Sequence, residues 1–526
     1  MGSPVAPEAV LPALTVLTPA VTAFALPLAH IAGFGRRGVE VLALLSSAVT
    51  GFFSVKLLMT VLRKGVPVTY CFGGWPPPLG IFYEVDLISA LLGCLTACLM
   101  FLIVLFSVGY MRDDGRLYLY YTLLMVVEAG MIGCFYTGDF FNLFVMIEVT
   151  AISSYALVSY FRDDRVAVAA SLKYAIYGAL ATTAYFAATV FAYGSMGTLN
   201  MADMHAKIAG ISTPLTGTGF ANINLGLLVF VALALYAFTY KSALFPNHFW
   251  LPEAHSSAPT PVSALLSGLV VNVGVYAIAR FTYTVIGNAS IVGKYIPLAL
   301  LASGAASAII GGLLMNLQRD VKRLIAYSTV MNLGFIALGY GLSTDLGIAA
   351  ATYHLITHSV AKAMLFLSIG LAITCAGSRN LSDLEGVGRA VPFIGFMVGV
   401  SVITLAGIPP FSVFMSEYAL ITAMVGAKNY PALMAFLTAY VAGAVAYLRL
   451  FYVICVKPPK KPLSVIKGRG ATYSTLALLA VACVVLGLLA PVIFKNVFMP
   501  AAHALTNSSQ YMKAFLQHAS TLLVER

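Results

Sequence analysis

Charge is the scarcest property of this sequence. Of its 526 residues, 9% are Asp, Glu, Lys or Arg and 60% are hydrophobic, and the mean hydropathy is +0.93. So little charge excludes a soluble protein with a large core and indicates a protein that crosses the membrane many times. The balance is basic, with 30 Lys and Arg against 19 Asp and Glu. Because most basic residues lie in loops, we attribute them to topology and to the lipid bilayer surface, and we expect no nucleic acid partner.

Other signatures are absent as well. The seven cysteines are scattered and show no CxxC or metal-ligand spacing, so we expect neither a metal site nor a disulfide framework. No phosphate-binding loop, dinucleotide fingerprint or cysteine cluster appears, and we expect no cofactor. The first ten residues lack a basic region, which predicts that the first apolar run is a permanent span and not a cleaved signal.

The apolar runs predict an all-α polytopic membrane protein with about 14 transmembrane helices. The expected spans lie near residues 11–32, 39–62, 84–110, 117–137, 139–161, 167–194, 224–250, 259–285, 293–315, 323–343, 346–374, 391–426, 431–456 and 472–494. The seventh and twelfth are overlong and contain Pro246 and Pro409–Pro410. Paired broken helices are typical of an inverted-repeat transporter, so we predict two inverted five-helix repeats, spans 4–8 and 9–13, with broken helices 7 and 12.

This pattern divides the chain into four parts. Residues 1–116 hold the flanking helices 1–3, and residues 117–285 form the first repeat. Residues 286–456 form the second repeat, and residues 457–526 hold a basic loop, span 14 and a short tail. Loops after odd-numbered spans carry sixteen Lys and Arg, against five after even-numbered spans. The odd loops should therefore face the cytoplasm, which places both termini outside the cell membrane.

The stretch from Tyr240 to Gly268 contains the first helix break. Lys241 follows an uncharged run and precedes Pro246 by five residues. A lysine beside unwound backbone inside a membrane indicates an ion pathway. Glu148, nine residues after Asp139, should lie about 14 Å deep in span 5 and is the natural partner for Lys241. The competing interpretation is a purely structural ion pair between spans 5 and 7.

Two further lysines have two interpretations each. Lys173 could receive a proton from Lys241, or it could extend to the cytoplasmic surface. Lys322 opens span 10 and could join Lys241 to His358, or it could be a topogenic surface charge.

Span 11 contains His354, His358 and Lys362 at i, i+4 and i+8, so they line one helix face. Zinc is disfavoured because no third ligand is evident. A proton relay suits histidine, which titrates near neutrality, and the competing interpretation is two core histidines bonded to carbonyls. Glu417 follows the second proline break and would end the row as an exit carboxylate. Glu128 in span 4 is an extra candidate that could be neutral or could face Glu148 and Lys241.

Together these segments resemble the antiporter-like subunits shared by respiratory complex I, membrane-bound hydrogenases and multi-subunit Na+/H+ antiporters of the Mrp type. The segments are GGWPPPLGIFYEVD (73–86), TGDFFNLFVMIE (137–148), YKSALFPNHFWLPEAHSSAPTPVSALLSG (240–268), QRDVKRLIAYST (318–329), HLITHSVAKAMLFL (354–367) and GIPPFSVFMSE (407–417). The GGWPPPLGI segment is similar to the hydrogenase and Mrp branch.

The resemblance implies the fourteen-helix fold and assigns the family's essential positions to Glu148, Lys241, His358 and Glu417. One position departs from the family: the usual span-8 lysine is replaced by Asn272, which cannot carry a proton charge. The resemblance also implies partners, namely other membrane subunits of a complex I-like, hydrogenase or Mrp assembly, and translocation of H+ or Na+. A stand-alone antiporter and a non-conducting scaffold subunit are the alternatives, and whether the host is an oxidoreductase stays open.

Overall fold

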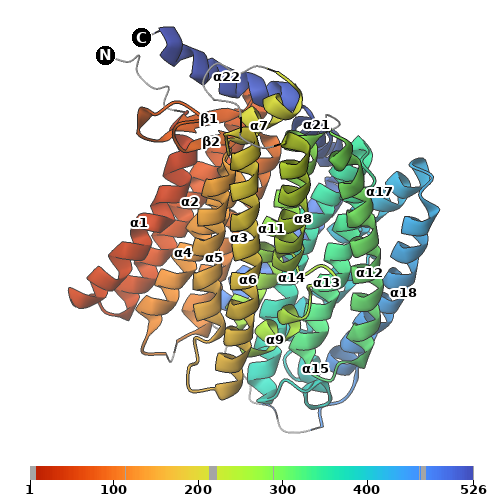
Figure 1. The fold of residues 1–526 in the computed structure, drawn as a ribbon. Helices are drawn as coiled ribbons and strands as arrows, with labels where there is room; N and C mark the ends of the chain where they lie inside the picture. Colours follow the sequence, from red (N-terminus) through yellow and green to blue (C-terminus); the bar gives the residue numbers. More distant parts are fainter. Residues whose placement is uncertain are drawn as a thin grey trace.

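The protein is a bundle of long, roughly parallel helices (Figure 1). The computed structural model describes residues 8–112, 114–211, 219, 222–287, 290–460, 463 and 470–524. Within this part of the chain, 13 helices are long and apolar enough to cross a membrane, or up to 14 if a bent pair is counted as one span. The expected multi-pass fold of about 14 spans is confirmed.

The first part of the chain forms the helices of the N-terminal side. They are α1 (Leu11–Ile31), α2 (Arg36–Lys64), α3 (Leu87–Tyr110), α4 (Leu117–Tyr136), α5 (Phe140–Val158), α6 (Arg165–Met196) and the short α7 (Met201–Ile208). Several begin where an acidic side chain caps the free backbone amides. Asp86, Asp139 and Asp164 accept hydrogen bonds from the first turns of α3, α5 and α6. These capping residues fix where the membrane helices start.

A small antiparallel hairpin interrupts the helical fold between α2 and α3. Strand β1 (Val68–Cys71) pairs with β2 (Phe82–Val85), and the short η1 (Phe72–Gly74) and a proline-rich loop connect them. The register places Thr69 opposite Glu84. Span 3 was expected from residue 84, but the helix starts at Leu87, because Glu84 belongs to the strand and Asp86 is the cap.

The two predicted helix breaks are present. Helix α8 (Ile223–Lys241) ends directly at Lys241, and α9 (Trp250–Ser257) follows a non-helical stretch. The chain then continues as α10 (Thr260–Leu265), η2 (Leu266–Val270), α11 (Val271–Ala279) and η3 (Arg280–Ile286). The expected span 224–250 is thus shorter in helix than predicted. The second break separates α16 (Pro392–Leu405) from α17 (Ser412–Gly426).

The remaining elements complete the bundle. They are η4 (Ile291–Lys294), α12 (Tyr295–Leu317), α13 (Val321–Gly341), α14 (Asp345–Ala376), η5 (Leu381–Leu384), α15 (Val387–Ala390), α18 (Tyr430–Phe451), η6 (Tyr452–Val456), α19 (Gly470–Leu488), α20 (Ala490–Ile493), η7 (Phe494–Phe498), α21 (Met499–Thr506) and α22 (Ser508–Val524). The most buried spans are α10–η3, α13 and α14. In the apolar 18-residue stretch of each span, 100%, 94% and 83% of the residues are buried. The ionisable residues of span 11 therefore lie on a central helix.

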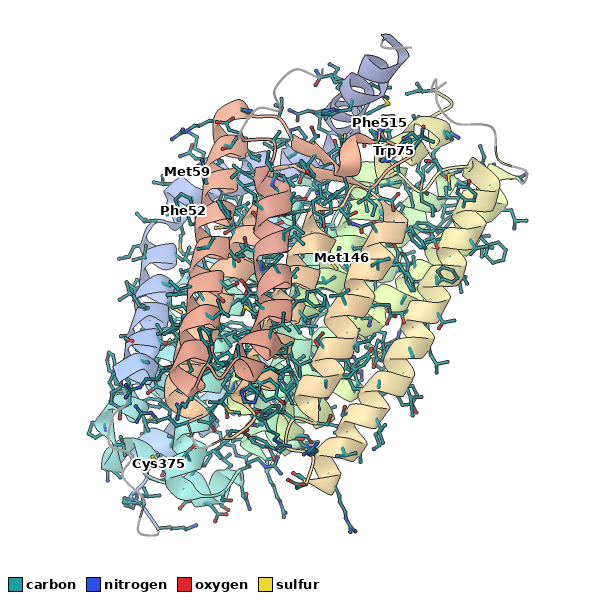
Figure 2. All side chains as sticks on the ribbon, turned by 90° about the vertical axis from the view of Figure 1, so that its left-hand side faces the viewer. Phe52, Met59, Trp75, Met146, Cys375 and Phe515 are labelled. Atoms are coloured by element: carbon teal, nitrogen blue, oxygen red, sulfur yellow. The ribbon has the colours of Figure 1, made fainter. Side chains whose placement is uncertain are left out.

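The two ends of the bundle differ. The hairpin, α7 and α22 lie together at one end, here called the hairpin end, and α15 lies at the opposite end (Figure 1). Between the ends the surface is apolar: Phe52 and Met59 project outward from α2 (Figure 2) and are 63% and 51% exposed. An exposed apolar belt of this kind is suited to lipid or to a neighbouring subunit.

Candidate functional site

Lys241 ends α8 at the first break, as the proline pattern predicted. Its side chain is 7% exposed, and Nζ donates a hydrogen bond of 3.4 Å to the Tyr155 hydroxyl. Nζ also lies 5.8 Å from the centre of the Tyr155 ring. A lysine at the C-terminus of a helix faces the negative end of the helix dipole, which favours its charged form. The break thus provides Lys241 with weak partners, and none of them is a full negative charge.

Glu148 does not form the direct ion pair with Lys241 that was expected. Among the described residues, no ion pair of 4.0 Å or less includes either side chain. Glu148 and Tyr155 are seven residues apart on α5 and so share a helix face, and the charge of Glu148 acts on Lys241 and on Tyr155. Tyr155, which the sequence reasoning missed, is therefore the group in contact with Lys241 in this region.

Lys173 pairs with a residue that the sequence reasoning did not single out. Its Nζ lies 3.0 Å from Glu253 Oε2, and the Lys173 side chain is 60% exposed. Glu253 lies on α9, directly after the first break. The pair sits on the outside of the bundle, so the structure does not place Lys173 among the buried lysines.

Lys322 is buried, not at the surface. Its Nζ donates to the Ala258 carbonyl at 2.7 Å, between α9 and α10, and the residue is 5% exposed. His255 is buried beside it, stacked on Phe366 at 4.9 Å, and both Lys322 and Lys362 act on it electrostatically. The sequence signal for His255 was present, since it follows the break within the WLPEAH segment.

Lys362 is completely buried on α14. Its Nζ contacts the Ser328 hydroxyl, donates to the Ile325 carbonyl at 3.2 Å, and lies 5.9 Å from the centre of the Tyr447 ring. Among the described residues, no carboxylate lies within ion-pair distance of Lys362 or Lys322. Neutral oxygens alone compensate poorly for a buried charge, which makes proton loss from such lysines easier.

The two histidines of α14 have different surroundings. His354 is hydrogen-bonded on both ring nitrogens, to Ser416 Oγ at 2.9 Å and to Asn332 Oδ1 at 3.1 Å. His358 is equally buried, and neither of its ring nitrogens has a partner. Their ring centroids are 6.2 Å apart. His354 is thus held in place, whereas His358 has free positions for a proton donor or acceptor.

Glu417 lies at the second break, as expected. It is 4% exposed, on α17, and a Cβ at Gly407 would collide with its Oε2. Gly407 has φ +64°, a conformation that favours glycine. The nearby Tyr440 hydroxyl donates to the Ala406 carbonyl at 3.1 Å. The break therefore depends on a glycine for two reasons, its backbone conformation and the space that Glu417 requires.

Asn272 joins α11 to α14. Its Nδ2 donates to the Gly268 carbonyl at 2.7 Å and to Ser359 Oγ at 2.9 Å, while Oδ1 is buried without a partner. Ser359 is the residue after His358. The Lys241 break packs on Gly274, where a Cβ would collide with Ser242 Oγ.

Glu128 does not face Glu148 or Lys241. Its Oε2 accepts a hydrogen bond of 3.3 Å from Ser47 on α2, and the residue is fully buried. It therefore lies on the α2 side of α4, while Cys134, about two helical turns later, is the α4 residue on which the Lys241 charge acts. The structure separates Glu128 from the other candidates.

We give one name, the buried row, to the half-buried Glu148 and the buried residues Lys241, Lys322, His255, Lys362, His358, His354 and Glu417. Within the described residues, no group of three or more His, Cys, Asp or Glu side chains could hold a metal ion. Besides Tyr155, Glu253 and His255, the sequence reasoning missed the neutral partners Ser328, Asn332, Ser359 and Ser416, because such residues give no distinct signal in an apolar helix.

Comparisons with known proteins find similar membrane subunits. A subunit of the Na(+)/H(+) antiporter of Alkalihalophilus pseudofirmus is 34% identical over 398 residues, which are 76% of this chain and 76% of that protein. A subunit of the NADH-quinone oxidoreductase of Desulforudis audaxviator is 32% identical over 418 residues, covering 78% and 79%. A chain of the membrane-bound sulfane sulfur reductase, an archaeal respiratory membrane complex, superposes with a TM-score of 0.87 at 29% identity, covering 95% and 99%.

A family profile matches as well, over residues 137–442, and its description is "NADH:quinone oxidoreductase/Mrp antiporter, TM". The matched region runs from the turn before α5 to α18 and includes every member of the buried row. This chain therefore belongs to the NADH:quinone oxidoreductase/Mrp antiporter family of multi-pass membrane proteins.

Proposed function

We propose that this chain is the ion-translocating membrane subunit of a multi-subunit complex of the Mrp, complex I-like or hydrogenase type, and that protons move through the buried row. One observation carries the proposal: Lys241, Lys322 and Lys362 are 7%, 5% and 0% exposed and are held by neutral oxygens. Uncompensated charges are expensive inside a membrane protein, so lysines kept in such places support a role in proton exchange.

The row offers a sequence of charge interactions. When Glu148 accepts a proton, Lys241 loses the negative charge that favours its ammonium form, and its proton becomes easier to release. The next acceptors are Lys322 and His255, followed by Lys362 and His358. His354 and Glu417 lead to the second break. Each step between two of these lysines and histidines transfers one proton between groups whose charged forms disfavour one another.

The host assembly and the membrane are part of the proposal. The solved chain to which this one is similar belongs to a respiratory membrane complex, and the relatives are subunits by name. We therefore place the chain in the cell membrane beside other membrane subunits. The excess of Lys and Arg in the loops after odd-numbered spans supports an orientation with both termini and the hairpin end outside. Na+ is a second transported ion, favoured by the name of the Alkalihalophilus relative. The four-part division of the chain, with two inverted repeats, stays part of this proposal.

The test is ion translocation by the intact complex in proteoliposomes. Glu148→Gln and Lys241→Ala should each abolish translocation while the subunit still assembles. The matched control is Lys294→Ala, which removes a lysine at the end of the bundle away from the buried row. Normal pumping by either of the first two variants would leave the row with a structural role only. A single chain that exchanges Na+ for protons without partners would contradict the multi-subunit assignment.

A further inference from the structure

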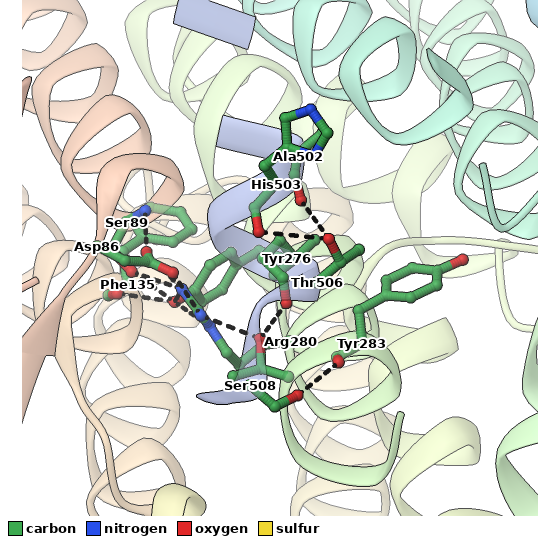
Figure 3. Close-up of polar contacts among 12 residues, drawn as sticks. Asp86, Ser89, Phe135, Tyr276, Arg280, Tyr283, Ala502, His503, Thr506 and Ser508 are labelled. Atoms are coloured by element: carbon green, nitrogen blue, oxygen red, sulfur yellow. Dashed lines mark hydrogen bonds and ion pairs between the residues drawn. The ribbon is translucent and has the colours of Figure 1, made fainter. Parts of the chain in front are cut away.

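A second polar cluster lies at the hairpin end, outside the buried row. Its centre is Arg280, 1% exposed, which forms a two-pronged ion pair with Asp86 at 2.7 Å for each contact (Figure 3). Arg280 also donates to Ser89 Oγ at 2.9 Å and to the Tyr276 hydroxyl at 3.1 Å. The guanidinium lies 5.2 Å from the centre of the Tyr511 ring, on α22. Arg280 and Asp86 thus satisfy one another.

Glu84 lies next to this pair and has no such partner. It is 1% exposed, and both of its carboxylate oxygens are without a hydrogen bond. The Tyr511 hydroxyl is also buried and without a partner. A Cβ at Gly138 would lie 3.3 Å from Glu84 Cβ and 3.3 Å from Tyr511 Oη, so both side chains border the turn between α4 and α5. A buried carboxylate with two unused oxygens indicates a group that takes up a proton or a ligand.

The charged and titratable groups around Glu84 come from several neighbouring elements. Asp86 and Arg280 act on it from α3 and η3, and Tyr511 faces it from α22. Across the hairpin, Thr69 lies opposite Glu84 and contacts His518 Nε2 at 2.6 Å. Burial raises the pKa of Glu84 well above its usual value, against the opposing charge of Arg280. Burial acts on Asp86 too, but there the Arg280 pair lowers the pKa below its usual value.

Water can reach this cluster from the surface. A cavity of about 360 Å³ lies between the ends of α2 and α3 and the helices α21 and α22. Its lining includes Asp86 and Tyr511, which neighbour Glu84, and the polar side chains of Asn507 and Gln510, but not Glu84 itself. His503, also in the lining, has a side chain that is 60% exposed, so the cavity opens beside it.

The cluster is also connected to the interior along one helix face. Asn272, Tyr276 and Arg280 follow one another at i, i+4 and i+8. Arg280 bonds to Tyr276, and Tyr276 bonds to Ser89 and to the Phe135 carbonyl. Asn272 bonds to Ser359, beside His358 of the buried row. The polar face formed by α11 and the start of η3 thus runs from the hairpin end to the contact between Asn272 and Ser359 on α14.

We propose that Glu84 is a proton-exchange site of this subunit, which trades protons with water in the cavity beneath α22 and is coupled along α11 to the buried row. In uptake, an O–H bond forms on the Glu84 carboxylate and a hydronium ion becomes water, and release reverses this step. This inference rests on the proposed function, because a proton path needs a group that exchanges protons with water at each side of the membrane.

The first test is infrared spectroscopy of the purified complex, because it needs no transport. The parent should show the C=O band of protonated carboxyl groups at neutral pH, and the part of that band contributed by Glu84 should be missing from Glu84→Gln. The matched control is Glu8→Gln, which removes an exposed carboxylate 2.8 Å from Lys64 at the same end and should leave the band unchanged. An unchanged band in Glu84→Gln would overturn the proposal.

The second test is translocation in proteoliposomes at varied pH on the hairpin side. Glu84→Gln should translocate roughly a hundredfold more slowly, as expected for loss of a positioned proton-transfer group, and should lose the pH dependence on that side. If the Glu84→Gln complex does not assemble, Tyr511→Phe keeps the ring over Arg280 and should shift the carboxyl band of Glu84. An unshifted band would then count against the site. Normal rates in Glu84→Gln with inactive Lys241→Ala would sink this inference alone, whereas normal rates in both would sink the proposed function.

Discussion

Arg280 and Lys362 are both buried cations on spanning segments, yet their surroundings differ. Arg280 has a two-pronged carboxylate, three hydroxyls and an aromatic face. Lys362 has one hydroxyl, one carbonyl and a more distant ring. Arginine cannot lose its proton in a protein, whereas a buried lysine readily does. The difference teaches that full compensation identifies a structural charge, and poor compensation identifies a charge that is free to change.

The largest effect should come from breaking the well-compensated pair. Arg280→Met leaves Asp86 buried and alone, which should destabilise the protein by about 3–5 kcal/mol. The expected result is a much lower amount of folded subunit in the membrane and a lower unfolding temperature in detergent. The double variant Asp86→Leu with Arg280→Leu should recover most of the lost stability, since no lone charge remains. Equal loss in the single and double variants would show that the charges are not what stabilises this contact.

The poorly compensated lysine should respond in the opposite way. Lys362→Met keeps a similar volume and removes a charge that has only neutral partners, so the unfolding temperature should be unchanged or higher. Translocation by the complex should fall roughly a hundredfold, because a proton-carrying group is missing. The comparison requires both measurements on the same preparation. A destabilised Lys362→Met protein would place Lys362 with Arg280 among the structural charges.

Asn272 is an uncharged residue between the cluster at the hairpin end and the buried row, and it gives a further test of the comparison. Asn272→Leu removes the hydrogen bond to Ser359 and should lower translocation about tenfold, the effect of roughly one lost hydrogen bond in a reaction path. Asn272→Lys restores an ionisable group and should preserve or raise coupling. Initial rates in proteoliposomes measure both variants. Parent-like rates in Asn272→Leu would mean that no proton path passes this residue.

The smallest effect concerns a capping carboxyl outside the helices. Burial raises the pKa of Asp139 from 3.8 to about 6. Between these two pH values Asp139 is deprotonated in the unfolded chain but still protonated in the folded protein. The free energy of unfolding therefore falls as the pH rises from about 4 to about 6, and this group causes no further change above that range. Asp139→Asn keeps a good N-cap and cannot titrate, so its unfolding temperature should fall less over this range. Identical pH profiles for the parent and the variant would contradict the assignment.

The fold was largely predictable, because hydropathy locates spans and prolines locate breaks. The positions of Lys241 and Glu417 beside breaks followed directly, and so did the shared face of His354, His358 and Lys362. Helix rotation was not predictable: a sequence gives the depth of Glu128 but not that it faces Ser47 on α2.

Contacts between segments far apart in the sequence could not be predicted either, because they also depend on how each helix is rotated. The sequence could not show that Tyr155 stands beside Lys241, or that Lys173 pairs with Glu253. The hairpin was missed because its strands are short and flank a proline-rich loop, so the second strand merged with the apolar run of span 3. The roles of the buried row stay predictions until the variants are measured.

The position of α22 sets an order of events during synthesis. Tyr511 covers the Arg280 guanidinium, and His518 contacts the hairpin through Thr69. Both residues follow every spanning helix along the chain, so they leave the ribosome after all those helices have been made. The Tyr511 ring can therefore pack over the Arg280–Asp86 pair only after those helices have been made. A chain that is interrupted before residue 511 lacks this cover, which distinguishes it from a finished one.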